Sequence, residues 1–209
     1  LPTPFLGFGH RVSIGVVLHG ADNAATAAGL AEDILRYDQQ GCLSAAMLFT
    51  EGECAPFAEH LAAALEHLCR AWRVPPRTLH EAAAVRAVRA AAAFAPGARL
   101  WGDPQQRWTL VHIPGRQPEP SCGLGVVRLH ALRSISDLEA QLAPLRRHLQ
   151  GAALAAPPER RREAAEMLAR AGVNRICAPG RLQAPPFSWH HDGRPVLASL
   201  VRWVDVEDE

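Results

Sequence analysis

Apolar, β-branched runs alternate with Ala-rich amphipathic stretches along this 209-residue chain, and this alternation constrains its fold more than any other feature. Residues 11–18 (RVSIGVVL) are typical of a buried strand, and residues 57–72 of a helix that follows a first-turn proline. The predicted strands are residues 11–18, 46–50, 98–101, 108–113, 125–132, 151–156, 173–177 and 196–204, and the predicted helices are residues 24–37, 56–72, 79–94, 136–149 and 158–171. Strands that alternate with helices build a parallel sheet between helical layers. The sequence therefore predicts an α/β domain with three layers and a mostly parallel sheet.

The last predicted strand stands apart from the others. A Pro- and Gly-rich loop, residues 178–195, precedes it. We therefore divide the chain into a catalytic-type domain of residues 1–180 and an arm of residues 181–209. Because the loop is long, we expect the strand at 196–204 to pair outside the main sheet, with another domain or another subunit.

The composition lowers the expectation for several classes of partner. Lys and Arg total 22 against 21 for Asp and Glu, so the net charge of +1 offers no field to attract nucleic acid or an anionic membrane. No apolar run approaches the roughly 18–20 residues that span a bilayer, and residues 1–20 lack the pattern of a signal peptide. We expect no nucleic-acid partner, no membrane span and a cytoplasmic location.

The number and spacing of the cysteines also favour a cytoplasmic location. They number five, at 42, 54, 69, 122 and 177, and none forms a C-x-x-C pair. An odd number without such spacing argues against a zinc site and a disulfide framework, and favours a reducing compartment. We expect no bound metal.

Cys42 lies at a junction suited to chemistry. A helix is predicted to end near Tyr37, the polar run DQQG follows, and a strand begins shortly after Cys42. Gly41 permits a sharp turn and close approach of a ligand. Backbone N–H groups and polar side chains of Gln40, Gly41, Leu43 and Ser44 would stabilise a thiolate and a developing oxyanion, so that Cys42 could attack a carbonyl carbon. From these residues alone, a buried structural cysteine remains the alternative.

Two ends of the chain carry a family resemblance. The segments LAED (30–33) and DQQGCLS (38–44) are similar to the active-site region of the LuxC-type acyl-CoA reductases, a fatty-acid reductase branch of the aldehyde dehydrogenase superfamily. The C-terminal signature also resembles that family, through GVNRIC (172–177), Pro179-Gly180, Pro185-Pro186, Trp189, HDG (191–193) and LVRW (200–203). Residues 8–13 and 125–153 resemble strands and a helix of the cysteine-bearing domain. The middle third, about 75–120, carries no such motif.

The resemblance implies a reaction and its partners. Cys42 would take the acyl group of an acyl-CoA or another acyl thioester, and hydride from NADPH, or NADH, would release an aldehyde. The oxyanion would be held partly by the Cys42 backbone N–H. The cofactor would be bound mainly by a domain that is not in this chain and that we expect to precede Leu1. We also expect a homo-oligomer.

One departure from the superfamily pattern refines this expectation. Aldehyde dehydrogenases carry a general-base Glu in an E-L-G-G motif upstream of the cysteine, and the matching stretch here is Gly7-Phe8-Gly9-His10. Gly7 therefore stands where the base would be. That Glu activates water to hydrolyse the acyl-enzyme, so its absence favours a reductase.

Other residues are weaker candidates. His10 could act as an acid or base beside Cys42, although a polar strand end is its commoner role. Glu119 lies near the position where the superfamily keeps a carboxylate that contacts the cofactor ribose. His190-His191-Asp192 resembles a metal cluster, but adjacent side chains in a loop do not converge, so we interpret it as a turn. Cysteines 54, 69, 122 and 177 are interpreted as structural, and the arginines at 160–162 as a solvated helix face rather than a contact for CoA phosphate.

Two alternatives stay open. A CoA-acylating aldehyde dehydrogenase would use the same cysteine in the oxidative direction. A non-catalytic module would use the terminal strand as an oligomerisation surface.

Overall fold

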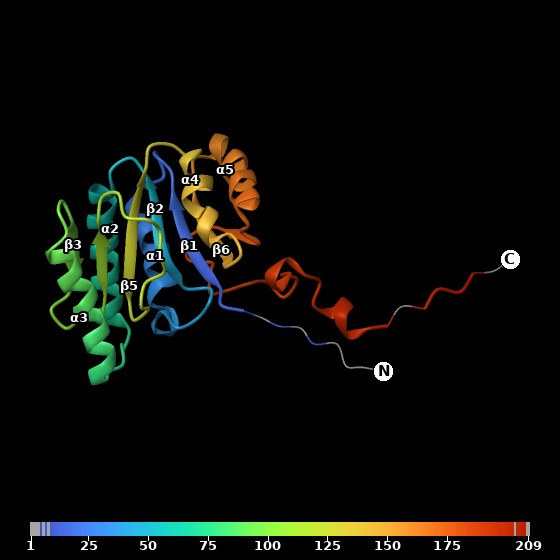
Figure 1. Ribbon diagram of the computed structural model, residues 1–209, viewed down its shortest axis with the longest axis horizontal. Coiled ribbons are helices and arrows are strands. Elements are labelled where there is room, and N and C mark those ends of the chain that lie inside the picture. The colour runs from blue at the N-terminus through green and yellow to red at the C-terminus, as the bar shows by residue number, and fades with distance from the viewer. Residues whose placement is uncertain (1–4, 6, 8, 203, 208–209) are drawn as a thin grey trace.

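A computed structural model describes residues 5, 7, 9–202 and 204–207 of the chain. Within these residues, a seven-stranded sheet has the order β3-β4-β5-β2-β1-β6-β7 (Figure 1). The strands are β1 (Val12–Val17), β2 (Ala45–Glu51), β3 (Arg99–Gly102), β4 (Thr109–His112), β5 (Val126–Leu132), β6 (Leu149–Ala155) and β7 (Arg175–Cys177). The helices are α1 (Ala24–Leu35), α2 (Cys54–Ala71), α3 (Leu79–Ala93), α4 (Asp137–Leu142) and α5 (Pro158–Ala171).

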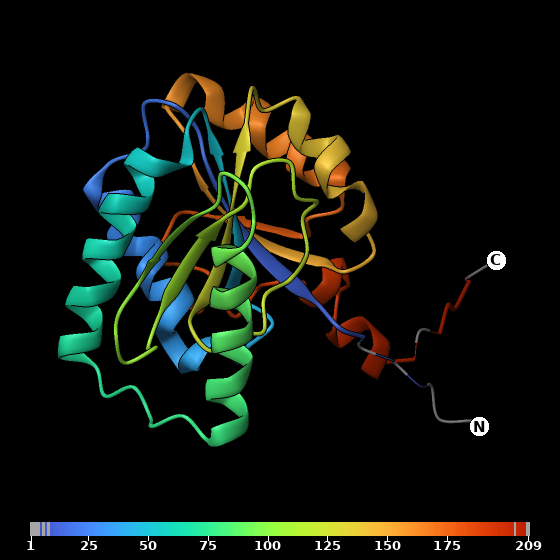
Figure 2. The same cartoon turned by 60° about the vertical axis from the view of Figure 1, so that its left-hand side comes forward.

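The predicted fold class is confirmed. Every described strand pair in the sheet is parallel except β3 with β4. One core, with Leu30, Phe57 and Leu61, joins α1 and α2 to the sheet, and a second, with Leu138 and Leu168, joins α4 and α5. Figure 2 shows the two helix pairs on opposite sides of the strands. The three layers follow from alternation along the strands, which directs neighbouring side chains to opposite faces.

Several predicted helix boundaries move, among them the end of α1, which lies at Leu35 rather than at residue 37. The helix predicted at 136–149 is shorter, because α4 ends at Leu142 and a 3-10 turn covers Ala143–Leu145. Pro144 explains this, since proline lacks an N–H and crowds the preceding turn. Helix α2 begins at Cys54, two residues before Pro56, which still lies in the first turn where no intrahelical donor is needed.

The terminal segment differs from its prediction. Leu197–Leu200 forms a 3-10 helix, and the described residues after it have no regular structure, while Trp203 lies outside the described residues. The segment runs away from the sheet (Figure 1), so no neighbouring strand of this chain supplies hydrogen bonds to make it a strand. The strand at 196–204 is therefore wrong for this chain alone, and its pairing with another domain or subunit stays a prediction. The division at residue 180 also stays a prediction.

The loop after β7 is anchored on α1. Both carboxylate oxygens of Asp33 accept backbone hydrogen bonds, at 2.7 Å from Gly180 N and 2.9 Å from Leu182 N. Gly29 allows the close approach, because a Cβ there would lie 2.7 Å from the carbonyl carbon of Pro179. Leu182 is fully buried. The anchored loop holds Gln183 in place, and Gln183 donates a hydrogen bond to Ser44, two residues after Cys42.

No helix in the described part of the chain combines the length and apolar character needed to cross a membrane.

Replacing Asp33 tests this anchor. Asp33→Ala leaves two loop N–H groups without their acceptor, so the free energy of unfolding should fall by about 2–5 kcal/mol, measured by urea denaturation. Asp137→Ala is the matched control, because Asp137 pairs with the exposed Arg133 and its loss should cost clearly less than the loss of Asp33. Equal losses in the two variants would contradict the anchoring role.

The same residue gives a pH dependence. Burial raises the pKa of Asp33 from 3.8 to about 6, against the opposing effect of its backbone hydrogen bonds. Between these values the folded chain binds more protons than the unfolded chain, so the contribution of Asp33 to stability decreases as pH rises from about 4 to 6. The variant Asp33→Asn has no titrating side chain at this position. The unfolding free energy of wild type should therefore fall relative to that of Asp33→Asn as the pH rises over this range. A constant difference would show that Asp33 titrates normally.

Candidate active site

The turn between α1 and β2 has an unusual backbone. Helix α1 ends at Leu35, and Tyr37, Asp38 and Gln39 then take positive φ values of 57°, 54° and 58°. A left-handed conformation costs a non-glycine residue about 1–2 kcal/mol. Three in succession therefore require support from outside the turn.

Contacts with the backbone of β2 and β5 and with one arginine provide that support. Gln39 Nε2 donates to Ala45 O at 2.8 Å and to Val126 O, at the start of β5, at 3.0 Å. Asp38 forms an ion pair with Arg77 from the loop before α3. The sequence did not suggest Arg77, because it lies in the region without motifs.

Cys42 follows directly on this turn. Ser44 N donates to Gly41 O at 2.9 Å, which closes a tight turn around Cys42 just before β2. Ser13 Oγ on β1 donates to Cys42 O at 2.7 Å, and Gln183 Nε2 donates to Ser44 Oγ at 2.7 Å. The Cys42 side chain is exposed and its thiol is free. The backbone of Cys42 is therefore fixed while its sulfur faces outward.

The sulfur faces a cavity of about 850 Å³. Its lining comes from residues just before or at the start of four parallel strands: 9–12 before and in β1, 39–46 at β2, 120–124 before β5, and 145 and 148 before β6. In a parallel sheet these amino-terminal ends lie along one edge, which explains why segments far apart in sequence meet here. Of the predicted site residues, His10, Gln40, Gly41 and Ser44 line this cavity together with Cys42, whereas Leu43 does not, and their chemical roles stay predictions.

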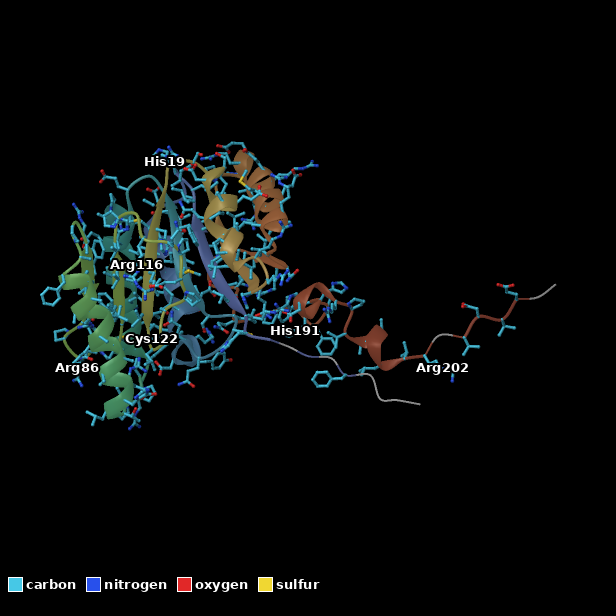
Figure 3. The ribbon with its side chains drawn as sticks, in the orientation of Figure 1. His19, Arg86, Arg116, Cys122, His191 and Arg202 are labelled. Carbon is cyan, nitrogen blue, oxygen red and sulfur yellow. The ribbon has the colours of Figure 1, made fainter. Side chains whose placement is uncertain are left out.

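Cys122 is a finding that the sequence analysis missed. It was interpreted as structural, but it is exposed and lines the wall of the cavity formed by residues 120–124 (Figure 3). Although the residue is exposed overall, its sulfur is partly covered by this wall, and the loss of water around it raises the pKa of the thiol. The signal available was its Gly-rich context, SCGLG, which is typical of a turn at a ligand.

The other cysteines are inert by environment. Burial raises the pKa of Cys54, whose sulfur also accepts a hydrogen bond from Thr50. Burial raises the pKa values of Cys69 and Cys177 to about 11. These thiols stay protonated at neutral pH and are poor nucleophiles.

The remaining candidates lie around the cavity or apart from it. Glu119 is outside the lining, and its Oε1 pairs with Arg116 at 2.7 Å and Arg128 at 2.9 Å. Asp192 accepts from Arg11 and Gln150, each at 3.0 Å, within a 3-10 turn, as the interpretation of HHDG as a turn requires.

Arg160, in the first turn of α5, forms an ion pair with Glu51 on β2, and hydrogen bonding from Arg160 lowers the pKa of the Glu51 carboxyl. Among residues 5, 7, 9–202 and 204–207, no three His, Cys, Asp or Glu side chains come together as metal ligands.

The sheet order and the layers define a fold class, the α/β fold of the solved aldehyde dehydrogenases. NADP-dependent glyceraldehyde-3-phosphate dehydrogenase from Bacillus halodurans has the same fold, with a TM-score of 0.67 and 16% identity over 92% of this chain and 44% of its own. Indole-3-acetaldehyde dehydrogenase from P. syringae matches with a TM-score of 0.62 and 16% identity over 81% of this chain and 38% of its own.

Sequence comparison then gives the family. The family model "Acyl-CoA reductase (LuxC)" matches residues 2–203, so this chain belongs to the LuxC family. It is 28% identical over 207 residues to a long-chain acyl-protein thioester reductase of Aliivibrio fischeri, and 27% identical to that of Photobacterium phosphoreum. Each match covers 97% of this chain, which spans 42% and 41% of those relatives.

Thiol counting tests the assigned environments. In the native chain the exposed Cys42 and Cys122 should react with Ellman's reagent within minutes, because the reagent reaches their sulfurs. Cys54 and Cys69, which are buried, and Cys177, which is half-buried, should react only after denaturation. Cys42→Ser and Cys122→Ser should each remove one fast equivalent. A fast equivalent lost in Cys54→Ser would contradict the structure.

Proposed function

We propose that this chain is the cysteine-bearing part of an acyl thioester reductase, and that Cys42 is its nucleophile. The observation that carries the proposal is the exposed, free Cys42 thiol on a rigid turn at the mouth of a large cavity, in a chain of the LuxC family. The fatty acyl group would come from an acyl-CoA or an acyl-protein thioester.

The first step is acyl transfer. The Cys42 thiolate attacks the thioester carbonyl carbon, a new carbon–sulfur bond forms, and the bond to the departing thiol breaks. The Cys42 backbone N–H has no acceptor within the described residues, so it is available to donate to the developing oxyanion. His10 lines the same cavity and is the proposed acid that protonates the departing thiolate.

The cavity also suits the acyl chain and protects the intermediate. Val12, Ala46, Leu124 and Leu145 supply apolar surface for the chain. No Asp or Glu is present among the described lining residues, and Gly7 carries no side chain that could act as a base. Water near the acyl-enzyme would therefore lack a carboxylate to activate it, which favours reduction over hydrolysis.

A nicotinamide cofactor, NADPH or NADH, would supply the hydride that converts the acyl-enzyme to an aldehyde. Glu119 fits a role in holding it, because the residue is half-exposed and both of its ion pairs use Oε1, which leaves Oε2 for a ribose hydroxyl. The rest of the cofactor site is proposed for a domain outside this chain. A homo-oligomer is also proposed, with the segment 181–209 as its candidate contact.

Acylation of the chain tests the proposal. Incubation with palmitoyl-CoA followed by intact mass measurement should show one thioester-linked acyl group on wild type, sensitive to neutral hydroxylamine. The adduct should vanish in Cys42→Ser and persist in Cys122→Ser, the matched control in the same cavity. An adduct that survives in Cys42→Ser, or that is lost only in Cys122→Ser, would overturn the assignment.

A further inference from the structure

The two walls of the cavity share a backbone feature. The Cys42 wall includes Gln39, the last residue of the left-handed run Tyr37–Gln39. The facing wall, residues 120–124, includes Gly123 and Leu124, which with Gly125 form a second run with φ values of 73°, 61° and 76°. In both runs the middle residue is not glycine. The left-handed conformation of these middle residues costs conformational energy. Each run therefore needs a contact from outside it to stabilise that conformation.

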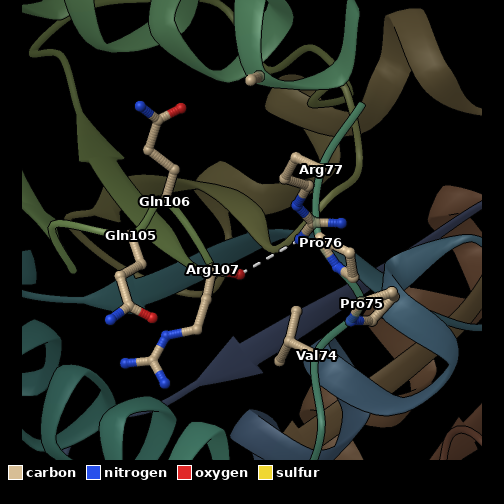
Figure 4. A pocket seen from close by; sticks show the side chains of 8 residues that line it. Val74, Pro75, Pro76, Arg77, Gln105, Gln106 and Arg107 are labelled. Carbon is tan, nitrogen blue, oxygen red and sulfur yellow. Dashed lines mark hydrogen bonds between the residues drawn. The ribbon is translucent and has the colours of Figure 1, made fainter. Parts of the chain in front are cut away.

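Arg77 contacts the middle residue of both runs. Its guanidinium forms the ion pair with Asp38, and its Nη2 donates to Leu124 O at 2.9 Å. The same Nη2 reaches Arg107 O at 3.4 Å, across a smaller cavity of about 460 Å³ (Figure 4). The side chains of Arg77 and Asp38 are only 8% and 11% exposed, so little water screens the pair.

The chemistry of this link requires arginine. A guanidinium has several donors in a rigid, planar fork and can bond a carboxylate and carbonyl oxygens at once, whereas a lysine ammonium is a point charge on a flexible stem. Removing the cation would leave the buried Asp38 carboxylate unpaired, which favours movement of the turn toward water.

We propose that Arg77 is a positioning residue for acyl transfer: it fastens the Cys42 turn to the facing wall and so fixes the nucleophile relative to the thioester. This inference rests on the proposed function of Cys42. Its physical basis is that a displacement of about 1 Å in a reacting group can cost up to roughly 100-fold in rate.

The test compares Arg77→Met and Arg77→Lys with Arg89→Met. Arg89 is a matched control, because it is also partly buried and donates to Thr109 Oγ1 at 2.9 Å and Trp108 O at 3.0 Å, yet it makes no contact with the Cys42 turn. The variant Arg89→Met therefore shows how far loss of a partly buried arginine near β4 changes hydrogen exchange and acylation without any contact with the Cys42 turn.

Two readouts are needed. Hydrogen exchange of the peptide covering residues 36–46 should accelerate in Arg77→Met and stay at the wild-type rate in Arg89→Met. The maximal rate of Cys42 acylation by palmitoyl-CoA should fall by roughly 10- to 100-fold in Arg77→Met, with the half-saturating concentration changed by less than about twofold. Arg77→Lys should lie between wild type and Arg77→Met.

The outcomes separate this inference from the proposed function. Unchanged exchange at 36–46 in Arg77→Met, or faster exchange with an unchanged acylation rate, overturns the positioning role. An equal fall in acylation in Arg89→Met also overturns it. If wild type takes no acyl group, the proposed function fails, and the exchange measurement still decides whether Arg77 holds the turn.

Discussion

The left-handed turn at Tyr37–Gln39 is the constraint on which the site depends. Helix α1 and strand β2 are fixed by their packing in the core, and the chain must reverse between them within a few residues. The left-handed run makes that reversal and delivers Cys42 to the edge of the sheet with its sulfur outward. Its conformational cost is offset by the Gln39 amide, which bonds backbone at the starts of β2 and β5, and by the ion pair of Asp38.

The location of the cavity follows from the topology. Strands β2, β1, β6 and β5 are parallel neighbours, so the residues that precede them gather at one edge whatever their distance in sequence. Cys42, His10 and Cys122 all come from such residues. The described lining has two thiols, two histidines and apolar surface but no carboxylate, which is the composition that the proposed acyl-enzyme needs in order to escape hydrolysis. The chain spans less than half the length of the curated relatives it matches, so the proposal for Cys42 concerns one part of an active site.

Much of the fold could be predicted from the sequence, since the apolar runs at 11–18, 46–50 and 125–132 carry their own signal. The end of α4 was predicted at residue 149, because the effect of Pro144 was not taken into account. Cys42, His10 and Gly41 could be proposed from the sequence because they lie in local motifs. Arg77 could not, because it meets Asp38 and Leu124, which are distant in sequence, only after the sheet has formed. The strand predicted at 196–204 had the right composition, but a strand also needs a neighbour, and the described part of this chain provides none.

The central claim is that a left-handed turn presents Cys42 to a cavity suited to an acyl chain. The most direct test is a crystal structure of the Cys122→Ser variant, which lacks the second exposed thiol, after alkylation with a long-chain N-alkyl iodoacetamide. The account predicts a single adduct on the Cys42 sulfur, with its alkyl chain against Leu124 and Leu145 and positive φ values retained at residues 37–39. An adduct on another cysteine, an alkyl chain outside the cavity, or a right-handed turn at 37–39 would contradict it.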